Sequence, residues 1–272
     1  MINVVQTGNA NVYKGICLTA LSIMKYTKEP VHYHLMSAQV SWDKTSKITE
    51  EQADKLREVL KSYNEENELT YYDVSKDLED TFYNTPNMKP KYTPATLIRL
   101  FMDKYLDVDK LIYLDADIMT TASLEEFNKI DIDDKEMAVC LDYMGRFWIK
   151  RDYFNAGVLY VNLNECKKNN VFENCIELLK KKKYYFADQT ALYKTLRKKV
   201  YIPFRFNEQR DIKEDTVVKH FCKGIRYLPF FKVYNVKQWD VKNVHGFLKM
   251  NNFDDIYKLY DEVFKDYDKL SY

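Results

Sequence analysis

The two aspartates of Leu111-Ile112-Tyr113-Leu114-Asp115-Ala116-Asp117 are the residues whose type and spacing most directly indicate chemistry. They follow an apolar, β-prone run, which predicts a strand buried on both faces, and ligands of open α/β sheets bind beyond the carboxyl ends of such strands. Two neighbouring carboxylates repel each other and are costly to bury unless a cation joins them. The pair therefore predicts a divalent metal that also binds a diphosphate, although D-x-D also arises by chance or as a helix cap.

Other polar residues lie at the ends of predicted elements. The run 137–141 predicts a strand that ends at Asp142. The stretch 154–162 predicts a strand whose early small residues indicate a close approach of backbone or ligand. Ala187-Asp188-Gln189 is expected to open a helix. His32 and His34 share one face of a predicted strand, and we interpret them as packing or surface residues rather than metal ligands.

The elements that must position these residues follow from hydrophobic periodicity and turn residues. The turn Thr7-Gly8-Asn9-Ala10-Asn11 joins a first strand to a helix, but it is neither G-x-G-x-x-G nor a Walker A loop. The segment 77–91, with Pro86 and Pro90, is expected to be a loop across the mouth of a site. Further strands are predicted at 2–7, 31–37, 69–74 and 217–222, and helices at 13–26, 49–63, 94–106, from 123, at 164–182 and at 253–267.

This order of elements predicts an α/β fold. We expect one domain over residues 1–272, with a less regular C-terminal segment from about residue 228. The 272 residues are 46% hydrophobic, which is enough for one large α/β core.

Charge and cysteine usage narrow the class of protein. Lys and Arg number 42 against 41 Asp and Glu, so nothing indicates a nucleic-acid partner. Five cysteines without a C-x-x-C pair favour reduced thiols. The sequence opens without a signal-peptide pattern and contains no apolar stretch long enough to span a bilayer. We expect a cytoplasmic protein, with Lys180 to Lys183 making weak peripheral contact with the inner face of the membrane as the minor alternative.

Together these motifs resemble glycosyltransferase family 8, the retaining nucleotide-sugar transferases that include bacterial lipopolysaccharide galactosyl- and glucosyltransferases and glycogenin. The resemblance covers about residues 3–227 and implies the GT-A type of nucleotide-diphospho-sugar transferase fold, with a central, mostly parallel mixed sheet flanked by helices. It rests on Arg99-Leu100, residues 111–117, Asp142, residues 154–158, Asp188-Gln189 and His220-Phe221.

The resemblance implies a metal site and a donor. Asp115, Asp117 and His220 would hold Mn²⁺, with Mg²⁺ as the alternative, and the ion would bind the diphosphate of a uridine-diphosphate (UDP) sugar. Two carboxylates and one imidazole suit Mn²⁺ chemically. The donor-binding residues that it implies are Thr7, Asn9, Asn11, Arg99, Asp115, Ala116, Asp142, Asn155, Ala156, Gly224 and Arg226.

The resemblance places Asp188 and Gln189 against the reacting anomeric carbon. A neutral amide is a poor nucleophile, so Gln189 favours front-face attack with the departing phosphate as base. Asp188 would then orient the sugar or stabilise positive charge, and a covalent glycosyl adduct on Asp188 would overturn this hypothesis.

Two loops depart from the family pattern. The family commonly supplies an acid and a tyrosine to uridine, whereas this chain has Asn9 and Asn11, with Tyr13 one place late. Family members typically continue the metal histidine as H-x-x-G-x-x-K-P-W. Here Gly224 is one position late and Arg226 replaces the lysine, with Lys223 as a competing cation for the phosphates.

The sequence thus predicts a retaining, Mn²⁺-dependent hexosyltransferase. It would move galactose or glucose from a UDP-sugar to a hydroxyl acceptor, a glycan or lipid-linked glycan such as a bacterial surface-glycan precursor. Acceptor contacts are expected from residues 77–91, 143–151 and the C-terminal segment. Two alternatives remain at this stage, an inverting transferase of similar fold and a catalytically silent nucleotide-sugar-binding protein.

Overall fold

A mixed, mostly parallel sheet forms the centre of the molecule. The computed structural model describes residues 1–89, 93–226 and 232–264. Its seven-stranded sheet has the order β3-β2-β1-β4-β7-β6-β8. Neighbouring strands are parallel except at β7, which runs antiparallel to β4 and to β6. The predicted α/β class and sheet type are confirmed.

The first half of the chain supplies four strands of this sheet. Its elements are β1 (Ile2–Gly8), η1 (Ala10–Val12), α1 (Tyr13–Tyr26), β2 (Val31–Ser37), α2 (Glu50–Tyr63), β3 (Glu68–Asp73), α3 (Ser75–Phe82), η2 (Pro94–Phe101), α4 (Met102–Tyr105) and β4 (Lys110–Leu114).

The second half adds the remaining strands and two small antiparallel sheets, β5 with β9 and β10 with β11. Its elements are β5 (Ile118–Thr120), η3 (Leu124–Lys129), β6 (Met137–Leu141), α5 (Gly145–Trp148), β7 (Phe154–Asn162), α6 (Leu163–Lys168), α7 (Val171–Lys181), α8 (Ala187–Thr195), β8 (Lys199–Ile202), η4 (Phe204–Phe206), β9 (Val218–His220), β10 (Gly224–Arg226), β11 (Lys232–Tyr234), α9 (Val241–Asn243), the π-helix η5 (Val244–Leu248) and α10 (Asp254–Phe264).

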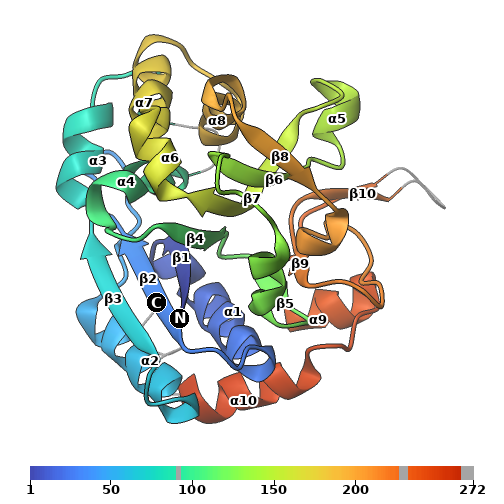
Figure 1. Cartoon of the computed structure of the whole chain (residues 1–272). Helices are drawn as coiled ribbons and strands as arrows, with labels where there is room; N and C mark the ends of the chain where they lie inside the picture. The colour runs from blue at the N-terminus through green and yellow to red at the C-terminus, as the bar shows by residue number, and fades with distance from the viewer. Residues whose placement is uncertain (90–92, 227–231, 265–272) are drawn as a thin grey trace.

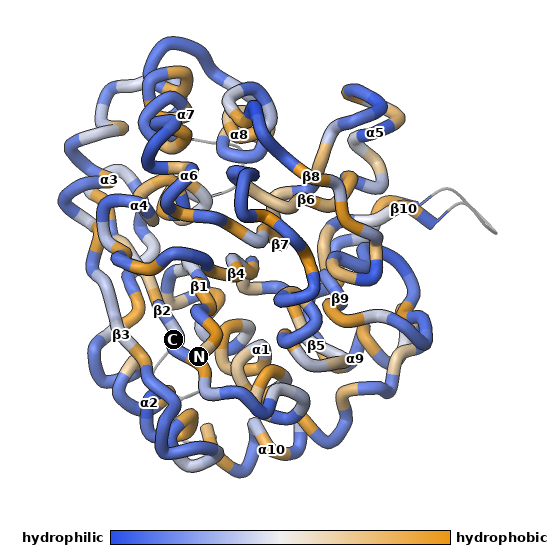
Figure 2. The backbone as a smooth tube through the Cα atoms, viewed as in Figure 1, coloured by the Kyte–Doolittle hydropathy of each residue, from blue (hydrophilic) through white to orange (hydrophobic). Residues whose placement is uncertain are grey.

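Helices cover both faces of the sheet (Figure 1). One core contains buried residues of α1, α2 and α10, and the other contains buried residues of α3, η2, α7 and α8. Figure 2 shows mostly hydrophilic residues along α2, at the edge of the molecule. In the described ranges, no helix combines the length and the apolar character needed to cross a bilayer. All five cysteines are free, and Cys222 alone is partly exposed.

Local sequence signals set several boundaries. The side chain of Thr49 accepts a hydrogen bond from the backbone N–H of Gln52, and the side-chain oxygen of Gln52 accepts one from the backbone N–H of Thr49, so the predicted capping box begins α2. Between α6 and α7, Asn170 adopts the left-handed conformation, with φ of 51°. The predicted single helix over 164–182 is therefore two helices.

Other predicted elements differ from the structure. The segment 77–91 was expected to be a loop, but most of its start belongs to α3, whose Leu78 and Phe82 are buried in the core. None of its described residues lines the cavity that contains Asp115. The helix expected over 94–106 is mainly the 3₁₀ helix η2 followed by one turn, α4. The C-terminal helix ends its described part at Phe264, and the rest of the predicted 253–267 span lies outside the described residues.

Strand direction gathers the polar residues at one edge of the sheet. β1 and β4 are parallel, and β6 runs in the same direction as β4 because both are antiparallel to β7. Asp115 and Asp142 therefore follow the carboxyl ends of strands that point the same way. Because β7 runs the opposite way, its first residues, including Asn155, lie at that same edge. The carboxyl edge of the sheet therefore carries the candidate site.

Candidate metal and donor site

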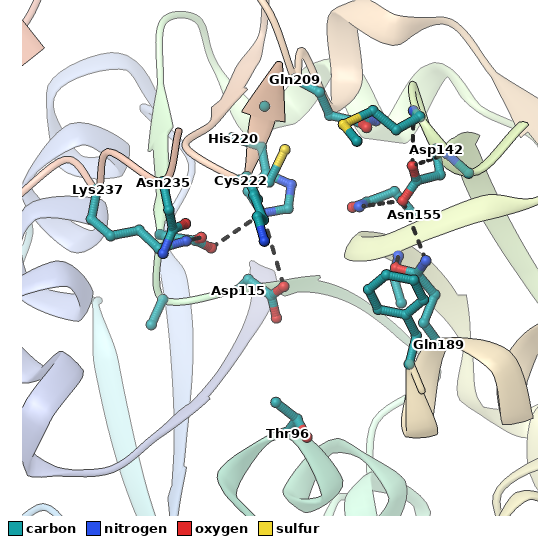
Figure 3. Close-up of a pocket in the computed structure, with 18 of the residues that line it drawn as sticks. Thr96, Asp115, Asp142, Asn155, Gln189, Gln209, His220, Cys222, Asn235 and Lys237 are labelled. Carbon is teal, nitrogen blue, oxygen red and sulfur yellow. Dashed lines mark hydrogen bonds and ion pairs between the residues drawn. The ribbon is translucent and has the colours of Figure 1, made fainter. Parts of the chain in front are cut away.

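A cavity of about 600 Å³ opens at this edge of the sheet. That volume falls within the usual range for small-molecule sites. Its walls come from the ends of β1, β4, β6 and β7, from η2 and α8, and from β9 with the segment that follows it. Figure 3 shows the polar side chains of these elements directed toward one space.

Asp115, Asp117 and His220 form a cluster with the composition of a metal site. One ligand atom from each residue lies within 4.8 Å of the other two, and within the described ranges this is the only such group of three. Nε2 of His220 lies 3.1 Å from a carboxylate oxygen of Asp117 and 4.0 Å from one of Asp115. The structure thus brings together the three predicted metal ligands, of which Figure 3 labels Asp115 and His220.

Two features of the backbone place His220 there. β5 pairs with β9 in a register that sets Ile118 opposite His220, next to Asp117, and the N–H of Phe221 donates to the carbonyl of Asp117 at 2.8 Å. Gly157 of β7 lies against the imidazole, since a Cβ on it would come within 2.2 Å of His220 Cε1. The small residue expected to permit a close approach therefore makes room for a metal ligand.

Arg99 joins Asp115 to Asp188. Its guanidinium donates to Asp115 Oδ1 at 2.7 Å and lies 3.1 Å from Asp188 Oδ2, while it also donates to the carbonyl of Ala156 at 2.6 Å. Arg99 is buried and stacks over the ring of Tyr113. Burial raises the pKa of Asp188, and the charge of Arg99 only partly opposes that effect. Arg99 is therefore committed to the protein's own carboxylates.

Lys237 is a site residue that the sequence analysis missed. Its ammonium pairs with Asp117 and donates to the carbonyl of Phe221 at 3.2 Å. Although burial opposes it, the charges of Lys237 and His220 lower the pKa of Asp117 well below its usual range. The signal was Lys237-Gln238-Trp239, which matches the K-P-W end of the family motif at two of three positions but stands much further from His220.

Asp142 is the centre of a second cluster. Its carboxylate accepts hydrogen bonds from the backbone N–H groups of Met144 at 3.0 Å and Gly145 at 2.6 Å. It also accepts from the side-chain amides of Asn155 at 3.1 Å and Gln189 at 3.3 Å. Three predicted site residues from β7, α8 and the end of β6 therefore share one network.

Asn207, which the sequence analysis did not single out, connects the two clusters. Its amide donates to Asn155 Oδ1 at 3.0 Å, so its own Oδ1 is the acceptor for His220 Nδ1 at 3.0 Å. Nδ1 is thus the nitrogen that Asn207 holds, and Nε2 of His220 is the nitrogen that would bind a metal ion placed between it, Asp115 and Asp117. No motif marked Asn207, because its role depends on the pairing of distant strands.

The remaining predicted donor residues divide into two groups. Thr7, Asn9, Ala116, Ala156 and Gly224 line the cavity, as does Lys223. Asn9 is 3% exposed, and in the described part of the structure its Oδ1 has no hydrogen-bond partner, which suits a ligand that donates to it.

Asn11 and Arg226 do not line the cavity. The guanidinium of Arg226 instead donates to the carbonyl of Phe247 at 2.7 Å and lies over its ring. Besides Arg99, the cation that contacts a metal ligand is Lys237, and Lys223 lines the same cavity.

Known proteins with related sequences are glycosyltransferases. A putative glycosyltransferase of Haemophilus influenzae is 28% identical over 233 residues, which are 76% of this chain and 67% of that protein. The lipopolysaccharide 1,2-glucosyltransferase of Escherichia coli is 30% identical over 203 residues, 58% of this chain and 60% of that protein. Some relatives are much longer, and the match to glycosyltransferase GlyA of Streptococcus pneumoniae spans 14% of its length.

The fold is shared with solved structures. The galactosyltransferase LgtC, solved with donor and acceptor sugar analogues, superposes with a TM-score of 0.70 over 95% of both chains at 19% identity. That likeness shows the GT-A fold. Residues 3–228 match the family model described as glycosyl transferase family 8. The chain is therefore a glycosyltransferase and belongs to family 8.

Proposed function

We propose that this enzyme transfers a hexosyl unit from a UDP-sugar to a hydroxyl acceptor, with retention of configuration and with dependence on Mn²⁺. One observation carries the proposal. The cluster Asp115-Asp117-His220 and the cluster Asp142-Asn155-Gln189 line the same cavity, as a diphosphate and a sugar joined by one bond require. The first cluster suits a cation, and the second suits hydroxyl groups.

The donor set fits the proposed ion. Two carboxylates and one imidazole nitrogen favour Mn²⁺, with Mg²⁺ as the alternative. The ammonium of Lys237 against Asp117 shows that this point of the site attracts a cation. When bound, the ion would act as a Lewis acid that neutralises charge on the diphosphate.

The chain's own residues would hold the two ends of the donor. Lys237, which pairs with Asp117, and Lys223, which lines the same cavity, supply positive charge for the phosphates. Asp142 and Asn155 are oriented by fixed hydrogen bonds and accept or donate to sugar hydroxyls. The buried Oδ1 of Asn9, which has no partner among the described residues, suits an N–H or O–H donor of the nucleoside.

The geometry around Gln189 supports front-face transfer. Its Oε1 accepts from the backbone N–H of Ala156 at 3.0 Å and its Nε2 donates to Asp142, so both ends of the amide are engaged. Asp188 is buried in an ion pair with Arg99, which reduces its value as a nucleophile. The acceptor oxygen would then bond to the anomeric carbon while the bond to phosphate breaks, and the phosphate oxygen would take the hydroxyl proton.

Relatives suggest the sugar and the acceptor class. The E. coli relative is named a lipopolysaccharide 1,2-glucosyltransferase, and one from Salmonella typhimurium is named a lipopolysaccharide 1,3-galactosyltransferase. We therefore propose glucose or galactose as the transferred unit and a bacterial surface-glycan precursor as the acceptor. Such a precursor would be met in the cytoplasm, at the inner face of the membrane.

The test is release of UDP from a panel of UDP-sugars, with and without Mn²⁺, by the wild type and by Asp117→Asn. We expect release to require Mn²⁺ and to fall by roughly 100-fold or more in the variant. Asp133→Asn, which removes an exposed acid paired with Lys110, is the control, and we expect it to release UDP at the wild-type rate.

Metal-independent release would contradict the proposed role of the metal cluster. Tight donor binding without any release, with or without acceptors, would favour the silent binding protein. A product of inverted configuration would favour the inverting mechanism.

A further inference from the structure

Three consecutive large apolar residues are exposed beside the cavity. In and after α5, the exposed fractions are 69% for Phe147, 75% for Trp148 and 49% for Ile149. A run of this kind on the surface of a soluble protein usually marks a binding site. In Figure 1, α5 stands out from the body of the molecule next to β6 and β8.

These residues do not share one environment. Trp148 and Ile149 line the cavity that contains Asp115 and Asp142, whereas Phe147 does not. Phe147 instead lies against its own neighbours, with its ring 4.7 Å from the guanidinium of Arg146 and edge-on to Tyr143. Trp148 and Ile149 thus face the cavity, and Phe147 does not.

α5 is fixed to the sugar-binding end of the cavity. The same carboxylate that would hold the donor sugar, Asp142, accepts hydrogen bonds from the backbone N–H groups of Met144 and Gly145 at the start of α5. A Cβ on Gly145 would come within 2.5 Å of the ring of Tyr153, so this turn packs closely onto the fold. The backbone at the start of α5 is therefore tied to Asp142.

The positions of Lys237, Asp142 and α5 along the cavity indicate which substrate would contact α5. Figure 3 shows Asp142 and Gln189 on the side of His220 away from Lys237. A donor bound with its phosphates near Lys237 would present its sugar at Asp142, and the wall beyond would be α5. The acceptor hydroxyl must reach the anomeric carbon beside the departing phosphate, so the rest of the acceptor would lie in the part of the cavity that the donor leaves open, and Trp148 and Ile149 line this cavity.

We propose that the indole of Trp148, supported by Ile149, is a stacking platform for a pyranose ring of the acceptor. This inference rests on the proposed function. An indole offers a large rigid apolar face together with a polar N–H, which suits the amphipathic face of a sugar ring. Arg210 lines the same cavity and offers N–H groups for hydroxyls, and its guanidinium already donates to the hydroxyl of Tyr143 at 2.8 Å.

The neighbouring cations raise a competing role, contact with an anionic membrane. Lys150 and Arg151 are exposed and follow the apolar run directly. Insertion into a membrane would use Phe147 and Trp148 alike, since both are similarly exposed. Only Trp148 of these two residues lines the cavity, which favours a role in acceptor binding over insertion into a membrane.

The experiment compares Trp148→Ala, Trp148→Phe and the matched control Phe147→Ala. UDP release from the UDP-sugar that the wild type hydrolyses is first measured without acceptor. Release is then measured against increasing concentrations of octyl β-galactoside, octyl β-glucoside and lactose, and the KM of the most effective glycoside is determined for each variant.

We expect acceptor-free hydrolysis to be unchanged in all three variants, which separates this test from the test of the proposed function. The KM for the glycoside should rise roughly 3- to 10-fold in Trp148→Ala, recover in Trp148→Phe and stay at the wild-type value in Phe147→Ala.

An unchanged KM in Trp148→Ala would overturn the proposal, as would equal effects of Trp148→Ala and Phe147→Ala. Equal loss of binding to anionic vesicles in both variants, with KM unchanged, would assign the run to a membrane instead. A wild type that hydrolyses its donor but is accelerated by none of the glycosides would also count against a carbohydrate acceptor.

Discussion

Single residues decide whether the metal ligands can meet, and Gly157 is the clearest case. A side chain at this position would overlap His220 and would also lie 2.9 Å from Asp115 Oδ2. We predict that Gly157→Ala displaces the imidazole and lowers the affinity for Mn²⁺ by about 10-fold or more, as loss of support for a metal ligand typically does. Calorimetric titration with Mn²⁺ and UDP measures this.

Gly246→Ala is the matched control, because nothing within the described structure lies within 4 Å of its added Cβ. Unchanged Mn²⁺ affinity in Gly157→Ala would show that His220 is not needed at this position.

Asn207 gives a second prediction at the scale of one residue. Asn207→Ala removes the acceptor for His220 Nδ1 and the donor to Asn155, and we expect the Mn²⁺ affinity to fall by about 10- to 100-fold. Asn162→Ala is the control, since its buried amide donates to the carbonyls of Ile132 and Asp133 away from the cavity. If both variants lost Mn²⁺ affinity equally, the effect would be general destabilisation rather than misplacement of His220.

The residue types of the site were largely predictable because each follows a strand or opens a helix. Asp115, Asp117 and Asp142 come directly after apolar runs, and Gln189 lies in the first turn of α8. Lys237 was not predicted, because the chain between it and His220 is longer than the family motif allows. Its place beside Asp117 depends on how β9 and the segment after it fold back over the cavity.

At the scale of elements, Asn170 separates two helices that the periodicity predicted as one. Its left-handed backbone is tolerated by Asn and by Gly, but it costs roughly 1–2 kcal/mol in other residues. We predict that Asn170→Val lowers the free energy of unfolding by about 1–2 kcal/mol, whereas Asn170→Gly is close to neutral. Urea unfolding of the two variants measures the difference, and equal stability would mean that the turn relaxes to another conformation.

His34, on β2 between β1 and β3, makes the stability of the fold depend on pH. Burial, with a smaller contribution from His32, lowers the pKa of His34 to about 3. The unfolded chain takes up this proton near pH 6.5, so the contribution to stability is present above that pH and is lost as the pH falls. We predict that the wild type loses about 2 kcal/mol more than His34→Gln between pH 7 and pH 5. Urea unfolding at both pH values tests this, and parallel losses would contradict it.

Elements with strong local signals were predicted well, and those that depend on tertiary pairing were not. The strands over 31–37, 137–141 and 154–162 are observed with the predicted bounds, since each is marked either by an apolar run or by alternation of apolar and polar residues. The short strands β5, β8, β10 and β11 were missed, because three or four residues carry no periodic pattern. The prolines at 86 and 90 suggested a long loop, but the apolar spacing of α3 begins before them.

At the scale of the whole molecule, the reversal of β7 was not predictable from the sequence. Its apolar run suits a strand of either direction, yet the reversal puts Asn155, Ala156 and Gly157 at the same edge as Asp115. The family resemblance supplied the fold that periodicity alone would have left open. The organisation of residues 1–272 as one domain stays a prediction.

The most direct measurement of the central claim is the anomalous diffraction of Mn²⁺ in crystals grown with UDP. The account predicts one anomalous peak between Asp115, Asp117 and His220, in contact with the diphosphate, with Lys237 released from Asp117 to the phosphates. UDP bound in the cavity without an ion at these three residues, or a Mn²⁺ peak elsewhere with this cluster empty, would contradict it.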